Sequence, residues 1–426
     1  MTTRHLRVAA VGLGALALVA SACSDKKETT TSSGGPKTLT AVPGFDPATN
    51  TIKLGVITPL SGPIAAIGLP LTAGNDVWFK RVNAAGGIAG KYKVELVKED
   101  SVYNPQTAVQ KYNALKGSVV AFAQILGTPS VNAVAPTLKA DNILAAPASL
   151  DAEWVGNPNL LPIGGPYQIQ MVNAVSYFVT EGGGTGKKLC HMGQNDVYGQ
   201  AGVEGVDFAA KELSLTITKK ETYASTKGGE AAAQVQSLKD AGCEAVFLTS
   251  TPTDTAGILG LAAKSSYSPK WIGQSPSWIG ALAASPLKDY FAANFLVASE
   301  GTEWGDTSVP GMKAMLDDVA KFAPEQKPDY YFGFGYNQAR AMAAVLEKAV
   351  ALGDLSHAGM IKATEQVGTL KFDGLSGDYP FGAPKDRKPP RATTLFKVDL
   401  AKPVGLGVLK RDFTSPAAEK FQFKTS

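Results

Sequence analysis

Apolar and polar positions follow two alternating periods along most of the chain. After the first fifty residues, short apolar runs are followed by stretches whose apolar positions recur at helical spacing. The run 51–59, for example, has the composition of a buried strand, and the face of a helix then follows at Leu71, Gly74, Trp78 and Val82. Short apolar strands that alternate with amphipathic helices are typical of a parallel sheet covered by helices. The pattern therefore predicts an α/β fold.

The same alternation of strands and helices occurs in two successive series along the chain. The first series runs through "KYKVELVKED", a helix that Asn104 caps and Pro105 begins, and the strands "SVVAFAQIL" and "NILAAPAS". A second series leads from "KKLCHMG" to "KWIGQ", and two long helical patterns and a strand-rich tail follow. We therefore predict two doubly wound parallel-sheet lobes joined by a hinge of several crossovers. Their predicted ranges are 49–163 with 301–372 for lobe one, and 164–300 with 373–426 for lobe two.

The N-terminus has the features of a secretory signal. Arg4 and Arg7 precede an uncharged run over residues 8–22, which is too short to span a membrane as a helix. The following "VASAC" resembles the bacterial lipobox, in which the cysteine, here Cys23, becomes the lipidated first residue. The alternative is an ordinary signal peptide with an incidental cysteine, but the polar "SDKKETTTSSGGPK" favours a lipoprotein. We expect a signal peptide over 1–22 and a disordered tether over 23–48.

Composition narrows the class of protein further. With 426 residues, 44% of them hydrophobic and 18% charged, the chain exceeds what a single core usually organises. The formal net charge is +4, and removal of Arg4 and Arg7 leaves 39 Lys+Arg against 37 Asp+Glu, or +2. This balance gives no indication of a nucleic-acid partner.

Two cysteines remain in the predicted mature body. Cys190 and Cys243 each lie in or beside a predicted strand, and an exported protein permits disulfides. A bridge between neighbouring strands and a pair of buried free thiols are both compatible with the sequence.

The sequence contains no recognisable catalytic motif. His5 lies in the predicted signal, and His191 and His357 are far apart and belong to no catalytic or zinc-binding motif. The stretch "GGGTGKK" over 182–188 mimics a phosphate-binding loop, but Glu181 stands where the first glycine is needed, and Lys188 replaces the serine or threonine. We therefore expect no enzyme, no metal and no cofactor.

Several longer stretches resemble one family. The opening "IKLGVITPLSGP", the return "GGIAGKYKVELV", "NPQTAVQ", "NILAAPASLDAEW", "NDVYGQAG" and "FDGLSGDYPF" look like the branched-chain-amino-acid (leucine-binding) type of periplasmic solute-binding protein, over nearly the whole mature chain. The resemblance implies a two-lobed type I binding fold that closes on a small solute. It also implies delivery to an ABC permease with separate ATPase subunits, and a monomer held by a lipid anchor at the outer face of the bacterial cytoplasmic membrane or in the periplasm. A ligand-binding sensor module of a signalling system is the alternative.

The resemblance also implies a binding site. In open parallel sheets, ligands bind beyond the carboxyl ends of the strands, where small residues expose backbone N–H groups. Carried over position by position, the lobe-one candidates are Ser61, Ile67, Gly127, Thr128, Ala148, Ser149 and Leu150. The remaining candidates are Tyr198, Thr251, Ser275, Trp278 and, from the long helical region, Tyr331.

Two departures from the family bear on the solute. Ser275 stands near the position where amino-acid-binding relatives carry an acidic residue, and Ile67 replaces a tyrosine. A buried ammonium group without a counter-charge costs several kcal/mol. Asp196 or Asp254 could supply that charge from nearby, so an α-amino acid stays open as a solute. The pocket as predicted suits a small neutral solute, or an aromatic or aliphatic acid, better.

Overall fold

The computed structural model describes residues 39–425. The predicted signal peptide and Cys23 lie outside this range. In the range that is described, no helix is both long enough and apolar enough to cross a membrane.

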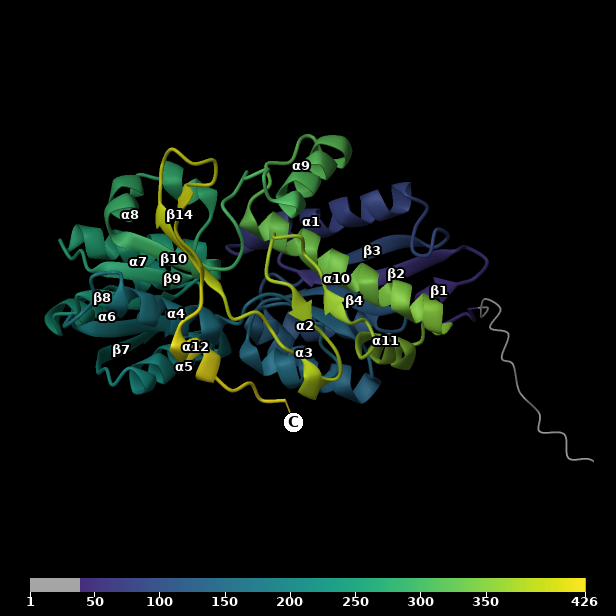
Figure 1. Ribbon diagram of the computed structural model, residues 1–426, viewed down its shortest axis with the longest axis horizontal. Helices are drawn as coiled ribbons and strands as arrows, with labels where there is room; N and C mark the ends of the chain where they lie inside the picture. Colours follow the sequence, from purple (N-terminus) through teal and green to yellow (C-terminus); the bar gives the residue numbers. More distant parts are fainter. Residues whose placement is uncertain (1–38, 426) are drawn as a thin grey trace, which may run out of the picture. The chain divides into compact units, whose positions relative to one another are not determined.

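Lobe one is built on the first of two large sheets (Figure 1). β2 pairs in parallel with β3 and β4, β4 pairs in parallel with β5, and short β1 pairs antiparallel with the start of β2. These strands are β1 (Phe45–Asp46), β2 (Thr51–Thr58), β3 (Lys93–Asp100), β4 (Ala121–Leu126) and β5 (Ala145–Ala148). One face packs against α1 (Ala65–Ala84), α10 (Tyr330–Leu352) and α11 (His357–Thr364), and the other against α2 (Pro105–Leu115) and α3 (Thr128–Asp141). As predicted, Asn104 caps α2, because its side chain accepts a hydrogen bond from the Thr107 N–H at 3.0 Å.

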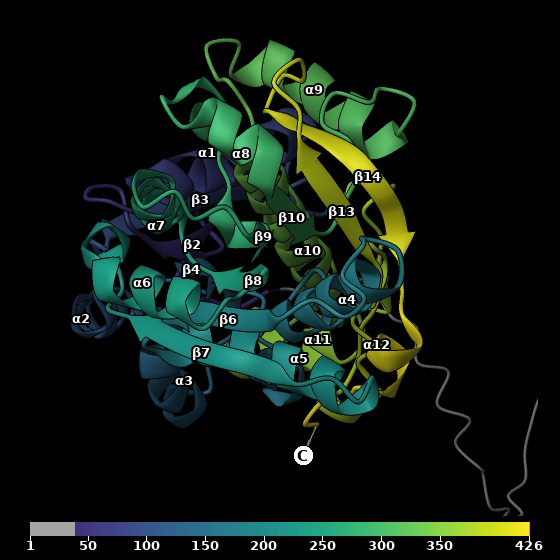
Figure 2. The same cartoon turned by 90° about the vertical axis from the view of Figure 1, so that its left-hand side faces the viewer.

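Lobe two is built on a seven-stranded sheet in the order β14-β13-β10-β9-β8-β6-β7 (Figure 2). Its strands are β6 (Leu189–Gln194), β7 (Ile217–Tyr223), β8 (Ala245–Thr249), β9 (Lys270–Gln274), β10 (Phe295–Ser299), β13 (Thr393–Val398) and β14 (Leu406–Phe413). The first five are parallel, and β13 and β14 are antiparallel additions at one edge. One face packs against α6 (Ala232–Asp240), α7 (Pro252–Lys264) and α8 (Lys288–Asn294). The other packs against α4 (Tyr167–Thr180), α5 (Val197–Glu212) and α12 (Pro416–Lys420).

The chain crosses between the lobes three times, between β5 and α4, between β10 and α9 (Pro310–Phe322), and between β12 (Tyr379–Pro380) and β13. The predicted fold class, two α/β lobes joined by several crossovers, is confirmed, and both sheets are mixed but mostly parallel. The predicted lobe border after residue 372 falls inside a hairpin of β11 (Thr369–Leu370) and β12. Tyr379 and Phe381 of this hairpin pack in the lobe-one core, so the chain returns to lobe two later than predicted.

The folded body of lobe one begins earlier in the sequence than predicted. Leu39 and Phe45 are buried in the core of lobe one, and Phe45 pairs with Ile52 across β1 and β2. The prediction of disorder is therefore wrong for residues 39–48, where isolated apolar residues in a polar stretch are anchored by the sheet edge.

The two cysteines lie in lobe two. Cys190 in β6 and Cys243, just before β8, are joined in a disulfide, with their Cα atoms 5.9 Å apart. Of the two alternatives that the sequence left open, the structure therefore has the bridge.

The backbones of helices α1 and α10 approach each other closely, and this contact fixes the position of α10. A Cβ added at Gly335 would lie 1.9 Å from the Leu71 carbonyl oxygen, and one at Gly74 would lie 2.1 Å from the Phe332 carbonyl oxygen. Both glycines are thus required by the approach of the two backbones. The close contact holds the N-terminal turns of α10 against lobe one, at the edge that faces lobe two.

Candidate functional site

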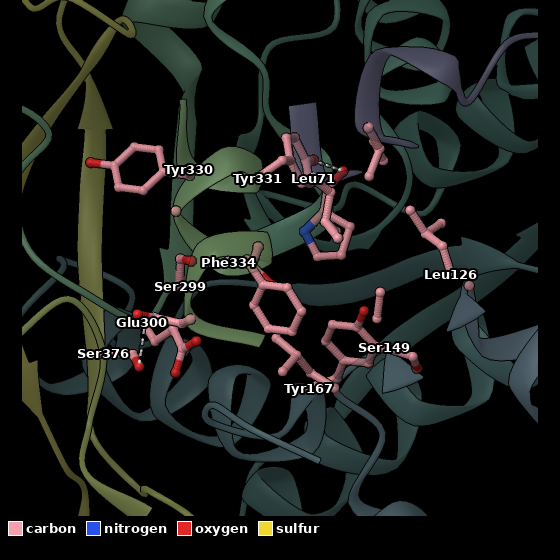
Figure 3. Close-up of a pocket in the computed structure, with 18 of the residues that line it drawn as sticks. Leu71, Leu126, Ser149, Tyr167, Ser299, Glu300, Tyr330, Tyr331, Phe334 and Ser376 are labelled. Atoms are coloured by element: carbon pink, nitrogen blue, oxygen red, sulfur yellow. Dashed lines mark hydrogen bonds between the residues drawn. The ribbon is translucent and has the colours of Figure 1, made fainter. Parts of the chain in front are cut away.

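A cavity lies between the two lobes, beyond the carboxyl ends of β4, β5 and β10 and beside the first turns of α10 (Figure 3). The space between its lining atoms is about 1040 Å³, counting the open mouth. Its walls are mainly apolar and aromatic, and Glu300 is the one charged residue among the described residues that line it.

Ten of the twelve predicted ligand residues line this cavity. Those from lobe one and α10 are Ile67, Gly127, Thr128, Ala148, Ser149, Leu150 and Tyr331. Those from lobe two are Tyr198, Thr251 and Ser275. The structure therefore brings together residues from separate segments of both lobes around one cavity.

Ser61 is not among the lining residues. Its exposed hydroxyl donates to Asp100 Oδ2 at 2.6 Å, and the Leu60 N–H donates to Asp100 Oδ1 at 2.9 Å. Burial alone would raise the pKa of Asp100, but these hydrogen bonds and one from the Val102 N–H lower it below its usual value. Ser61 thus joins the loop after β2 to the end of β3 and lies outside the cavity.

Trp278 also lies outside the cavity. Its indole is 4% exposed, stacks on Phe295 and contacts Phe291, and its Nε1–H donates to the Val404 carbonyl oxygen at 2.9 Å. The short turn after β9 directs this ring into the core of lobe two. The prediction that Trp278 faces the solute is therefore corrected to a packing position.

Tyr103 lines the cavity and was not among the predicted ligand residues. Its φ of 58° and that of Val102, 46°, lie in the left-handed region, which is costly for a β-branched residue such as valine. The Val102 N–H donates to Asp100 Oδ1 at 2.8 Å, and the Tyr103 N–H donates to Ser101 Oγ at 3.3 Å. The Tyr103 ring lies against Gly127, where an added Cβ would approach the ring within 2.6 Å. Strained, hydrogen-bonded backbone thus turns this tyrosine inward, and sequence periodicity carries no signal for it.

One end of the cavity presents hydrogen-bond donors. Thr128 Oγ1 and Ser149 Oγ are 2.7 Å apart, and the Trp154 Nε1–H donates to Ser149 Oγ at 2.9 Å. The two hydroxyls carry two hydrogens and use one in their mutual bond, so one O–H is left to donate into the cavity. The buried Tyr167 hydroxyl lies beside the same pair, and burial raises its pKa, so it is also a neutral donor.

The same end coincides with the start of a helix. Thr128 is the first residue of α3, and Gly127, at φ 98°, is its N-cap without a side chain to satisfy the free backbone N–H groups. These groups give the N-terminus of a helix a partial positive charge. The hydroxyl pair and the helix terminus together make this end of the cavity suited to a carboxylate.

Neither of the two alternative carboxylates faces the solute space. Asp196 caps α5 by accepting from the N–H groups of Tyr198 and Gly199 at 2.9 and 3.1 Å. Asp254 accepts from Gly228 N–H at 2.8 Å, and also from Gln194, Thr226 and Thr251. Both are absent from the described lining of the cavity. Asp254 has donors at both oxygens and Asp196 at Oδ1, all from lobe two, and neither carboxylate enters the cavity lining beside Ser275 as a counter-charge for an ammonium group.

Glu300 lies at the other end of the cavity, and it too was not among the predicted residues. Figure 3 shows it beside Ser299 and Ser376, with Phe334 between this group and Ser149. Its Oε2 accepts from the Gly165 N–H at 2.8 Å. Burial raises the pKa of Glu300 to about 7, although the Gly165 hydrogen bond opposes the shift. The available signal was its position directly after β10, because the carboxyl ends of parallel strands border the site.

We predict that Glu300→Gln makes stability less dependent on pH. In the unfolded chain the pKa of Glu300 has its ordinary value of 4.5, and in the folded protein it is about 7, so the folded state loses stability as pH rises through this window. The variant should match the wild-type protein near pH 4 and exceed its free energy of unfolding by on the order of 3 kcal/mol at pH 8. Urea unfolding at several pH values measures this, with the exposed Glu325→Gln as the matched control. A difference between variant and wild type that is the same at pH 4 and pH 8 would contradict the prediction.

Direct contacts join the lobes around the cavity. Tyr331 of α10 donates its hydroxyl hydrogen to the Pro276 carbonyl oxygen at 3.0 Å, and Thr253 Oγ1 donates to the Pro63 carbonyl oxygen at 3.2 Å. The first bond crosses beside the solute space and the second lies at the exposed rim. Two hydrogen bonds therefore join the lobes across the cavity in this structure.

The chain is similar to solute-binding proteins of known structure. The sequence profile of the family "Periplasmic binding protein" matches residues 51–403. The Leu/Ile/Val-binding protein homolog 7 of Brucella abortus (strain 2308) is 23% identical over 322 residues, which is 72% of this chain and 79% of that protein. The fatty acid ABC transporter substrate-binding protein from Thermomonospora curvata has a TM-score of 0.81 at 27% identity, covering 91% of this chain and 97% of its own. A branched chain amino acid ABC transporter protein from Thermus thermophilus with bound valine has a TM-score of 0.72 at 19% identity, covering 87% and 98%, and this likeness shows the fold alone.

Proposed function

This chain belongs to the periplasmic binding protein family, and from that premise we propose that it captures a small carboxylic acid with an aliphatic or aromatic body for an ATP-driven importer. It is a binding protein of the ABC transporter type and not an enzyme. The ATPase and the permease are separate subunits in this proposal. Similar proteins carry names that mention valine, leucine or fatty acid, so the family accommodates solutes that share a carboxylate and an apolar body.

The observation that carries the proposal is a group of hydrogen-bond donors in the cavity that has no acidic side chain beside it. Thr128, Ser149 and the start of α3 offer hydrogen bonds to a carboxylate, and the apolar lining beside them accepts the rest of the solute. An α-amino acid would place its ammonium within one carbon of this carboxylate. Such a cation would meet Ser275 and apolar walls instead of a carboxylate, at a cost of several kcal/mol.

In the proposed cycle the solute first contacts lobe one. Closure then adds Tyr198, Thr251 and Ser275 of lobe two, and contacts such as that of Tyr331 with Pro276 stabilise the closed state. The permease recognises this closed state. We also propose that Cys23 anchors the protein to the outer face of the membrane. Mass spectrometry of the mature N-terminus checks that anchor, and an unmodified cysteine would refute it.

A thermal-shift and calorimetric screen of the purified protein tests the solute class. We expect aliphatic and aromatic monocarboxylates to raise the melting temperature, and leucine and valine at equal concentration to have a smaller effect. The matching primary amides should bind more weakly than the acids, since hydrogen bonds to a charged group are stronger. Tighter binding of leucine or valine than of the acids would refute the proposed solute class.

A further inference from the structure

The end of the cavity opposite Thr128 and Ser149 presents hydrogen-bond acceptors. Glu300 uses Oε2 to accept from Gly165, and the described residues give its Oε1 no hydrogen bond. Asn337 donates through Nδ2 to Ser376 Oγ at 3.3 Å, and its buried Oδ1 has no partner within the described chain. Both residues line the cavity. Buried polar atoms usually have partners, so the unpartnered Asn337 Oδ1 indicates a donor from outside the chain, and Glu300 Oε1 offers that donor a second acceptor at the same end.

The described lining of the cavity adds attraction for a cation and contains no competing positive charge. Trp304 and Tyr330 also line the cavity, with ring centroids 5.5 Å apart in an edge-to-face arrangement. Aromatic faces attract cations, and a carboxylate does so more strongly. No lysine, arginine or histidine occurs among the described lining residues to satisfy Glu300 from within.

The two ends of the cavity thus have opposite polarity. We propose that the solute carries a carboxylate at one end and an ammonium or amide N–H group at the other, separated by a spacer that passes Phe334. The carboxylate binds at Thr128 and Ser149, and the donor group binds Glu300 and Asn337. This inference rests on the proposed function, because it assumes that the carboxylate end is correctly assigned.

The separation of the two ends distinguishes this solute from an α-amino acid. Phe334 stands between Glu300 and Ser149 in Figure 3, and Leu71 and Tyr331 flank the same middle section. An α-amino acid carries both charged groups on one carbon and cannot reach both ends. An ω-amino acid or a related amide of suitable length can, and Glu300 then acquires the counter-charge that the protein itself does not provide.

A ligand series tests the inference on the full-length protein. The probes are straight-chain acids of four to ten carbons, each as the unsubstituted, ω-hydroxy and ω-amino form, with dissociation constants from calorimetry at pH 7.5. At the best chain length we expect the ω-amino acid to bind at least tenfold more tightly than the unsubstituted acid. Glu300→Gln should remove most of this preference, so the two forms of the same chain length should bind the variant with affinities within about threefold of each other.

The outcomes separate this inference from the proposed function. Unsubstituted acids that bind as tightly as the ω-amino acids, or a preference that survives Glu300→Gln, would overturn the inference and leave the proposed function standing. If no acid of any form binds, both fail. The paired variant Thr128→Val with Ser149→Ala is the control for the first end, because it should weaken the ω-amino and unsubstituted acids by the same factor.

Discussion

Removing the disulfide should cost about 4 kcal/mol in free energy of unfolding. Cys190 and Cys243 are 53 residues apart in sequence, and the bridge restricts a loop of that length in the unfolded chain. On the chain-entropy model, a loop of this size corresponds to about 4 kcal/mol at 25 °C. The double variant Cys190→Ala with Cys243→Ala should show this loss in urea unfolding, and the melting temperature should fall with it.

Two controls identify the cause of that loss. A reductant should destabilise the wild-type protein to a similar degree and leave the double variant unchanged. Neither cysteine lines the cavity, so solute affinity at 25 °C should stay within about twofold in the double variant. Equal stability of the reduced and oxidised wild-type protein would contradict the assignment of a stabilising bridge.

Local patterns predicted much of the architecture because they follow from local physics. An apolar run such as that of β4 is buried on every residue and is covered by helices on both faces, which is what a parallel sheet requires. Asn104 followed by Pro105 caps α2 through a bond to a backbone N–H three residues away. The ends of strands then place Gly127 and Ser149 together, since parallel strands share one carboxyl edge.

The missed and misplaced residues depend on contacts between distant segments. Trp278 and Tyr331 are both aromatic residues near the cleft, yet Trp278 turns into the core of lobe two and Tyr331 reaches across to Pro276. Composition cannot separate these two outcomes. Glu300 is a single acid after a strand, and it matters only because Gly165, from another crossover, meets it.

The predicted border between the lobes differs from the observed one for the same reason. The predicted border places the second strand of the β11 and β12 hairpin in lobe two, because the sequence shows a strand-rich tail without showing where it packs. The antiparallel pairing with β11 keeps Tyr379 in lobe one. Strand pairing at this distance depends on tertiary structure and not on local propensity.

The hydroxyl pair should show strongly non-additive effects on carboxylate binding. Because Thr128 and Ser149 share two hydrogens and use one between themselves, either hydroxyl alone can still donate to the solute. We therefore expect Thr128→Val and Ser149→Ala each to weaken binding by no more than about threefold. The double variant removes a hydrogen bond to a charged group, which is worth about 1.5–3 kcal/mol, so its affinity should fall roughly tenfold to a hundredfold. Calorimetry of the two single variants and the double variant with one monocarboxylate gives the coupling.

The folding cost of these variants can be measured apart from the binding. Ser149→Ala leaves the Trp154 Nε1–H without its acceptor, so variants that contain it should lose about 1–3 kcal/mol of stability, and Thr128→Val alone should lose less. Thr137→Val is the matched control on α3, since its hydroxyl bonds to the Val134 carbonyl oxygen and does not line the cavity. If the double variant bound the acid as tightly as the wild-type protein, the carboxylate would have to bind elsewhere. If Thr128→Val alone abolished binding, one fixed donor and not an exchangeable pair would hold it.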